Sequence, residues 1–233
     1  MPNEHITSVF DRDLEAVQAH IMKMGGLVEA AITNAAKSLE TRDVELAEQV
    51  RAGDKAIDAR EDRINEEAAR VIALRAPTAR DLRLVLSVMK VSANLERIGD
   101  YAKNIAKRTT VLAEARHTQD GAAGMRRMAR EVEIMLKDAL DAYIQRDADI
   151  ARDVIERDRD VDQMYNGLFR EILTFMAEDP RSITACMHLH FIAKNVERMG
   201  DHVTAIAEEV IYLVTGERPT EARPKADTTS QTI

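Results

Sequence analysis

The sequence predicts an all-α protein made of two tandem, pseudo-symmetric three-helix bundles. Three observations point to this fold class: a seven-residue block occurs twice, apolar residues recur at helical spacing, and breaks are rare. The chain has 233 residues, of which 45% are hydrophobic and only 3% aromatic, with nine Gly and five Pro. A core of this composition must rely on aliphatic side chains and Met, which suit interdigitated helices.

The repeated block reads Asn, an apolar residue, Glu, Arg, an apolar residue, Gly and Asp. Its two copies are residues 94–100 and 195–201. Such a match implies an internal duplication, in which each copy is one structural unit. The matching positions upstream are Arg42 and Arg146, Asp43 and Asp147, Asp54 and Asp158, and Asp58 and Asp162.

Six long helices follow from this pattern and from the scarcity of Gly and Pro. They are expected at residues 8–39, 44–75, 79–113, 122–146, 148–178 and 181–215. Thr78, with Asp81 three residues on, is a capping signal for the third helix, and Asp179 followed by Pro180 is one for the sixth. Gly216 ends the sixth helix.

These elements divide the chain into four parts. Residues 1–113 form the first bundle, 114–124 a polar linker, and 125–215 the second bundle. Residues 216–233 are too polar to pack and are expected to be a disordered tail.

The third and sixth helices carry apolar stripes with steps of three and four residues, which predict their buried faces. The stripes are Leu84, Val88, Val91, Leu95, Ile98, Ala102 and Ile105, and Leu189, Ile192, Val196, Met199, Val203, Ile206, Val210 and Leu213. On the same helical wheels, Glu96, Asp100, Glu197 and Asp201 fall opposite the stripes, so these carboxylates are expected to face outward.

Charge and cysteine usage limit the function classes. The net charge is −8 and basic residues are interspersed with acidic ones, which argues against nucleic acid as a partner. Cys186 is the single cysteine, so no internal disulfide forms, and its apolar helical setting predicts a buried thiol. The chain contains no long apolar run and no N-terminal leader, which predicts a cytoplasmic protein without a membrane span. Residues 82–91 are apolar on nearly all sides, which indicates burial against the other bundle or another subunit, and we expect a homodimer.

Acidic pairs at i and i+4 are weak evidence by themselves, because about seven arise by chance in a chain this acidic. The repeated pairs are unusual in that each joins two like charges and encloses a helical glycine, Gly99 or Gly200, both of which cost stability. A bound cation would remove the repulsion, and we favour this interpretation. The alternative is that the glycines allow tight helix packing while the Asn and Arg residues cap or pair locally.

Four carboxylates could converge in each copy if its second and third helices are antiparallel neighbours. All-oxygen ligation favours hard cations such as Mg²⁺, Mn²⁺, Ca²⁺ or iron over a structural zinc site. The sequence shows no phosphate-cradling Gly-rich loop and no nucleophile elbow, so we do not expect an enzyme. The candidate metal ligands are Asp54, Asp58, Glu96, Asp100, Asp158, Asp162, Glu197 and Asp201.

On these motifs the chain closely resembles the PhoU family over about residues 5–215. The resemblance implies two similar three-helix bundles with multinuclear metal clusters on the eight acidic positions, the metal being iron, manganese, magnesium or zinc. It also implies a cytoplasmic negative regulator that links the ATPase of the phosphate ABC transporter to a sensor histidine kinase. Such a regulator keeps the phosphate-starvation response off when phosphate is plentiful.

The family often continues its acidic motif with an Asn and a Glu, and this chain splits the two between its copies. Asn104 is present in the first copy with Lys107 in place of Glu, while the second copy has Ala205 in place of Asn and keeps Glu208. Asn104 and Glu208 are therefore possible additional ligands, and the two sites should differ. The remaining alternative is a purely structural helical scaffold without functional metal.

Overall fold

The computed structural model describes residues 3–77, 79–115, 121–219 and 226–227. Within these ranges the protein is helical and contains no strand. The helices are α1 (Asn3–Thr41), α2 (Val44–Arg75), α3 (Ala79–Ala113), α4 (Gly121–Gln145), α5 (Ala148–Glu178), the short 3-10 helix η1 (Pro180–Ser182) and α6 (Ile183–Thr215).

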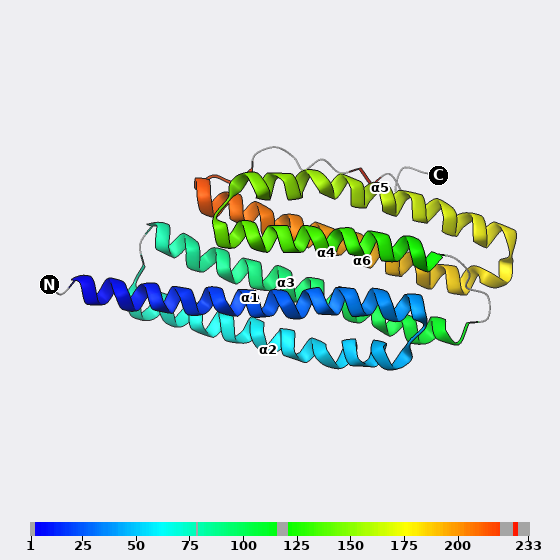
Figure 1. Ribbon diagram of the computed structural model, residues 1–233, viewed down its shortest axis with the longest axis horizontal. Coiled ribbons are helices and arrows are strands. Elements are labelled where there is room, and N and C mark those ends of the chain that lie inside the picture. The colour runs from blue at the N-terminus through cyan, green and yellow to red at the C-terminus, as the bar shows by residue number, and fades with distance from the viewer. Residues whose placement is uncertain (1–2, 78, 116–120, 220–225, 228–233) are drawn as a thin grey trace.

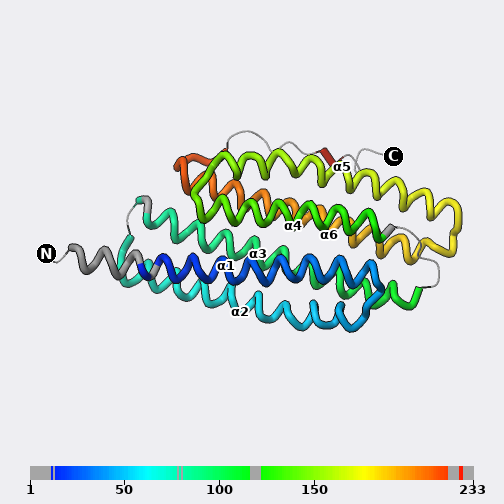
Figure 2. Tube along the Cα trace, in the orientation of Figure 1, coloured from blue at the N-terminus to red at the C-terminus, as the bar shows by residue number. Residues whose placement is uncertain are grey.

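The long helices all run along the long axis of an elongated molecule (Figure 1). Helices α1, α2 and α3 pack together as one three-helix bundle, and α4, α5 and α6 form the other. The bundles lie side by side and meet where α3 contacts α6 and α1 contacts α4. The chain path in Figure 2 shows the same division, with the first half below and the second half above. The predicted fold class is confirmed.

The repeated Arg-Asp pair forms the same turn in both bundles. Arg42 and Arg146 have φ of 53° and 55°, in the left-handed region that closes a tight connection between helices. The following Asp43 accepts a hydrogen bond from the Leu46 N–H at 2.9 Å, and Asp147 accepts from the Ile150 N–H at 3.1 Å. Each Asp therefore caps the helix that carries the upstream acidic pair.

The start of α6 differs slightly from the prediction. Asp179 does act as a cap, but its side chain accepts from the Arg181 N–H in the short helix η1, so that α6 begins two residues later, at Ile183. Gly216 ends α6 with φ of 83°, as predicted. Thr78, the expected cap of α3, lies outside the described residues.

Every residue of the two predicted apolar stripes is buried, and most buried apolar residues of the two bundles form one continuous core, with a small separate cluster of Ala68, Val71 and Val85. Cys186 is buried as expected, with its Sγ 3.5 Å from Ser182 Oγ. In the apolar segment 82–91, Leu84, Val85 and Val88 are buried inside the chain while Leu86 is 45% exposed. Contacts within the chain therefore cover most of this segment.

The contact between α3 and α6 joins equivalent positions of the repeat. Lys90 Nζ lies 3.0 Å from Glu209 Oε1, and the Arg108 guanidinium lies over the Phe191 ring at 4.3 Å from its centroid. Lys90 aligns with Phe191 and Arg108 aligns with Glu209, so the two contacts are counterparts under a pseudo-twofold rotation. The duplication read from the sequence is thus a symmetry of the fold.

None of the helices in the described ranges combines the length and the apolar character that crossing a membrane requires.

Candidate metal centre

The first acidic cluster lies between α2 and α3 and consists of Asp54, Asp58, Glu96 and Asp100. Lys103 bridges the two helices, with its Nζ 2.5 Å from Asp54 Oδ2 and 3.2 Å from Asp100 Oδ1. Asp54 is buried at 4% exposure, whereas Asp58 is exposed and Asp100 is one-third exposed. In this cluster, then, an ammonium group holds together carboxylates from two helices.

Crowding and burial of negative charge disfavour ionisation in this cluster. Burial, with Asp100 and Glu61 nearby, raises the pKa of Glu96 to about 7, although Arg97 opposes the shift. Burial and the neighbouring Asp54 also raise the pKa of Asp58. The hydrogen bond to Asp54 raises the pKa of Lys103, so the ammonium stays charged. A second positive charge at this place would be favourable.

The second acidic cluster lies between α5 and α6 and consists of Asp158, Asp162, Glu197 and Asp201. It is more enclosed than the first, because Asp158, Asp162 and Glu197 are only 2%, 4% and 4% exposed. Lys194 Nζ lies 2.8 Å from Glu197 Oε1, and the same ammonium lies 4.9 Å from the centroid of the Tyr165 ring.

Glu197 contradicts the prediction that the motif carboxylates face outward. A helical wheel with one buried stripe assumes one packed side, but α6 contacts α3, α4 and α5. Glu197 is buried, and its Oε2 is without a hydrogen-bond partner within the described part of the chain. Burial is the largest cause that raises the pKa of Glu197, and Asp201 adds to it.

The two motif glycines allow close approach of the preceding helix, in different ways. A Cβ at Gly99 would lie 2.9 Å from Ile57 Cδ1 on α2, so this glycine serves helix packing. A Cβ at Gly200 would lie 2.9 Å from Asp158 Oδ1 on α5, so this glycine makes room for a carboxylate of the second acidic cluster. Gly99 thus fits the packing interpretation, whereas Gly200 faces an acidic side chain, and the bound cation stays a prediction.

The eight predicted ligands are gathered into two clusters, one per bundle, which fits the prediction of antiparallel neighbours. Yet over the ranges that the structure describes, no group of three or more His, Cys, Asp or Glu side chains is arranged to hold a metal ion. Asn104 is exposed on α3 and Glu208 is half-buried on α6. Metal ligation by these residues stays a prediction.

The two lysines at the centres of the clusters were not predicted from the sequence. Lys103 lies three residues after Asp100 and Lys194 lies three residues before Glu197, a helical spacing that pairs charges and could have identified both. They are not counterparts in the repeat, since Lys103 aligns with Thr204 and Lys194 with Ala93. The two clusters therefore take their lysine from different positions of the repeat.

The C-terminal segment contacts the second acidic cluster, which was not predicted from the sequence. Asp162 Oδ2 accepts hydrogen bonds from the backbone N–H of Ala226 at 2.7 Å and of Asp227 at 3.2 Å. The rest of the predicted disordered tail lies partly outside the described residues. The contacts of Ala226 and Asp227 show that these two residues pack on the second bundle.

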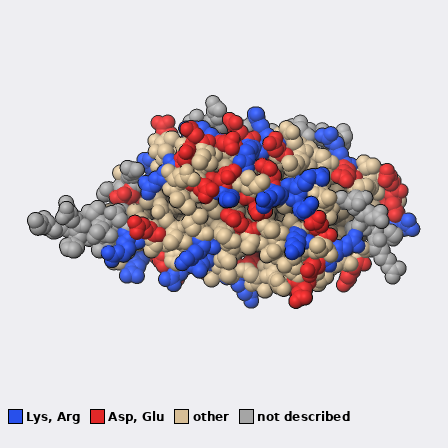
Figure 3. Space-filling model, in the orientation of Figure 1, with Lys and Arg blue, Asp and Glu red and all other residues tan. Residues whose placement is uncertain are grey.

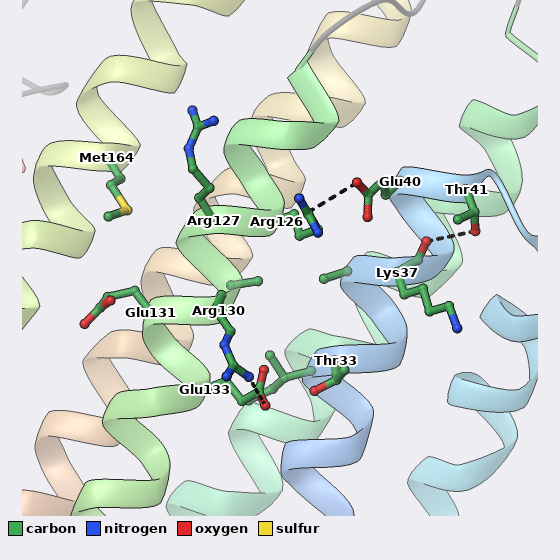
Figure 4. Close-up of a pocket in the computed structure, with 13 residues that line it drawn as sticks. Thr33, Lys37, Glu40, Thr41, Arg126, Arg127, Arg130, Glu131, Glu133 and Met164 are labelled. Atoms are coloured by element: carbon green, nitrogen blue, oxygen red, sulfur yellow. Dashed lines mark hydrogen bonds and ion pairs between the residues drawn. The ribbon is translucent and has the colours of Figure 1, made fainter.

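A separate groove of about 740 Å³ lies between α1 and α4 (Figure 4). Ile32, Ala36 and Ala129 contribute to its apolar lining. Its carboxylates are engaged in ion pairs: Glu40 with Arg126 at 3.2 Å, Glu133 with Arg130 at 2.8 Å, and Glu131 with Arg157 at 3.4 Å. Acidic and basic side chains are likewise intermixed on the face seen in Figure 3. The acidic clusters remain the candidate site.

Fold and site together define a class: a tandem three-helix-bundle protein with an acidic cluster between the second and third helices of each bundle. The family model described as "PhoU domain" matches residues 21–109 and 125–210, one match in each bundle. The chain belongs to the PhoU family.

Known relatives match over nearly the whole chain. The "phosphate-specific transport system accessory protein PhoU homolog" of Rhizobium meliloti (strain 1021) is 43% identical over 230 residues, covering 99% of this chain and 97% of the relative. The crystal structure of PhoU from Pseudomonas aeruginosa is similar with a TM-score of 0.86 and 42% identity, covering 89% of this chain and all of that one. The phosphate transport system regulatory protein PhoU from Streptococcus pneumoniae has a TM-score of 0.85 and 30% identity, covering 91% and 100%.

Proposed function

We propose that this chain regulates phosphate uptake and the phosphate-starvation response as a cytoplasmic adaptor. It binds the ATPase of the phosphate ABC transporter and a sensor histidine kinase, and it represses the response when phosphate is plentiful. The observation that carries the proposal is the match of both bundles to the PhoU domain, together with relatives named for phosphate transport and its regulation.

A metal is part of this proposal, and the donor set fits a hard cation. Each cluster offers carboxylate oxygens alone, which favour Mg²⁺, Mn²⁺ or iron over zinc. The buried Oε2 of Glu197 has no partner among the described residues, and burial, together with the neighbouring Asp100, raises the pKa of Glu96. In each cluster a lysine ammonium now balances the carboxylates, so a cation would replace Lys103 or Lys194.

A bound cation would act structurally, by joining the second and third helices of a bundle. Asp54 and Asp58 would hold it from α2, and Glu96 and Asp100 from α3. The adaptor role requires binding surfaces rather than turnover, and exposed helical faces supply them. The competing proposal is a structural scaffold whose acidic clusters are held by their lysines alone.

Substitution of one carboxylate in each cluster separates these two proposals. Asp100→Asn with Asp201→Asn keeps the side-chain shape and removes one negative charge per cluster, so bound Mn²⁺ or iron should fall at least about tenfold. Asp160→Asn, at an exposed position of α5, is the matched control. Elemental analysis and Mn²⁺-dependent thermal shifts that are equal in all three proteins would favour the scaffold.

Deletion of the gene tests the regulatory role itself. Cells that lack the protein should express phosphate-starvation genes in phosphate-rich medium, and the wild-type gene should restore repression. Normal repression in the deletion strain would refute the role. A pull-down with the transporter ATPase and the kinase tests the partners, and sedimentation of the purified chain tests the expected homodimer.

A further inference from the structure

The second acidic cluster holds a short stretch of the chain's own C-terminal segment. Asp162, on α5, accepts the backbone N–H of both Ala226 and Asp227 with one carboxylate oxygen, at 2.7 and 3.2 Å. One turn further along α5, Asn166 Nδ2 donates to the Ala226 carbonyl at 2.7 Å. Two neighbouring side chains thus satisfy both a donor and an acceptor of the same stretch of backbone, which is how proteins recognise a peptide main chain.

A charge contact adds side-chain selectivity to this backbone recognition. Lys194 Nζ, on α6, lies 3.0 Å from Asp227 Oδ2 as well as 2.8 Å from Glu197 Oε1. The Asp227 side chain is 18% exposed, so this pair lies partly out of water. A hydrogen bond between charged groups that are partly desolvated is stronger than an exposed ion pair.

The residues that hold the segment are buried in the docked chain. Asp162 is 4% exposed and Asn166 7%, and Glu197 keeps one oxygen without a partner among the described residues. The reach of the chain also suffices. Lys194 lies about 31 Å along the helix from the end of α6 at Thr215. The chain from Thr215 to Ala226 can span about 38 Å, which is enough to run back to Lys194.

The first acidic cluster lacks the corresponding receptor. The counterpart of Asn166 in the repeat is Asp62, whose carboxylate cannot donate to a carbonyl, and the counterpart of Lys194 is Ala93. Asp58, the counterpart of Asp162 in the repeat, is exposed. The two clusters are therefore built for different ligands although they arose from one sequence.

We propose that the second acidic cluster is a peptide-binding site for the chain's own Ala226–Asp227 segment, which blocks this cluster to a cation and leaves the first cluster open. The cation part rests on the function proposed above, whereas the docking of the segment does not. The Asp162 oxygen that accepts the two N–H groups cannot at the same time bind a metal ion strongly. Lys194, which pairs with both Glu197 and Asp227, must also move before a cation can bind. Peptide and cation thus compete.

Docking is tested on the full-length, metal-free chain by NMR measurement of amide hydrogen exchange at Asp227. In the wild type the Asp227 amide should exchange at least about tenfold more slowly than in an unstructured peptide. Ala226→Pro removes the N–H that donates to Asp162, and Asp227→Ala removes the carboxylate that pairs with Lys194, so both should abolish the protection. Glu217→Ala, which removes an exposed carboxylate between the end of α6 and Ala226, is the control and should keep the protection of the Asp227 amide.

Competition is tested by Mn²⁺ titration in an Asp100→Asn background, which weakens the first cluster and isolates the second. Asp227→Ala should raise the Mn²⁺ affinity at least about tenfold, Glu217→Ala should leave it unchanged, and added Mg²⁺ should speed exchange at Asp227 in the wild type. Unprotected Asp227 in the wild type overturns the docking. Protection without any change in Mn²⁺ affinity overturns the competition. Mn²⁺ binding to none of the proteins refutes the proposed metal and the competition with it, while exchange still decides the docking.

Discussion

The rings of Tyr101 and His202 lie with their centroids 5.7 Å apart across the contact between α3 and α6. The two residues occupy the same position in the repeat, one directly after Asp100 and the other directly after Asp201. Only residues near a twofold axis can touch their own counterparts, so the pseudo-symmetry axis passes between these rings. His202 Nδ1 also lies 2.8 Å from Asn94 Oδ1, so the repeated motif builds the interface between the bundles as well as the acidic clusters.

The ring contact should couple the two bundles energetically. In a double-mutant cycle with Tyr101→Ala and His202→Ala, we expect a coupling energy of about 0.5–1.5 kcal/mol in the free energy of unfolding. Urea unfolding of the four proteins measures it. Losses that simply add within experimental error would show that the rings touch without stabilising each other.

The sequence predicted the fold well because the information is local and repeated. Apolar residues, Leu95 and Val196 among them, follow one another at steps of three or four positions, and this spacing alone defines the packed side of a helix. The duplication then predicted two equivalent bundles, and the Arg-Asp pairs proved to be equivalent turns.

The site was harder to predict because the burial of a motif residue depends on contacts from outside its own helix. The wheel places Glu96 and Glu197 alike, and α3 and α6 each contact three other helices, yet Glu96 is 20% exposed and Glu197 only 4%. Glu197 lies beside Lys194, which also pairs with Asp227 of the C-terminal segment. The contacts of Ala226 with Asp162 and Asn166 join residues far apart in the chain through backbone groups, which leave no pattern in a sequence.

Gly99 and Gly53 offer a matched test of why a glycine sits in the motif. Both are helical, but a Cβ at Gly99 would meet Ile57 at 2.9 and 3.3 Å, whereas a Cβ at Gly53 would meet nothing within 4 Å. Gly53→Ala should stabilise the protein by about 0.5–1 kcal/mol, because alanine favours the helix. Gly99→Ala should lose that gain, since the buried Ile57 must shift, and should be neutral or destabilising by about 1 kcal/mol. Equal stabilisation by both substitutions in thermal unfolding would remove the packing argument.

Lys103→Met tests whether the ammonium stands where a cation would bind. Without metal, the buried Asp54 loses its partner, and the free energy of unfolding should fall by about 1–3 kcal/mol, less than for a fully buried pair because Lys103 is 41% exposed. With Mn²⁺, the same variant should bind the ion about tenfold more tightly than the wild type, because the ammonium no longer competes. Lys107→Met, at an exposed position one turn further along α3, is the control. A variant that is destabilised and that Mn²⁺ does not stabilise again would show that Lys103 forms an ion pair at a place where no cation binds.

Glu96 should make the metal-free protein less stable as pH rises toward neutrality. Burial and Asp100 raise the pKa of Glu96 from its ordinary 4.5 to about 7 in the folded state. Between these two values the folded chain binds more protons at Glu96 than the unfolded chain, so the contribution of Glu96 to the free energy of unfolding is fully present below about pH 4.5 and is lost as pH rises through 7. Glu96→Gln stays neutral and should lose less stability over this range, by on the order of 1–3 kcal/mol. Chemical unfolding at pH 5 and pH 8 in the presence of a chelator measures the difference, with Glu66→Gln, at an exposed position of α2, as the control. If the stability of Glu96→Gln and wild type changes in parallel with pH, ionisation of Glu96 does not destabilise the folded chain.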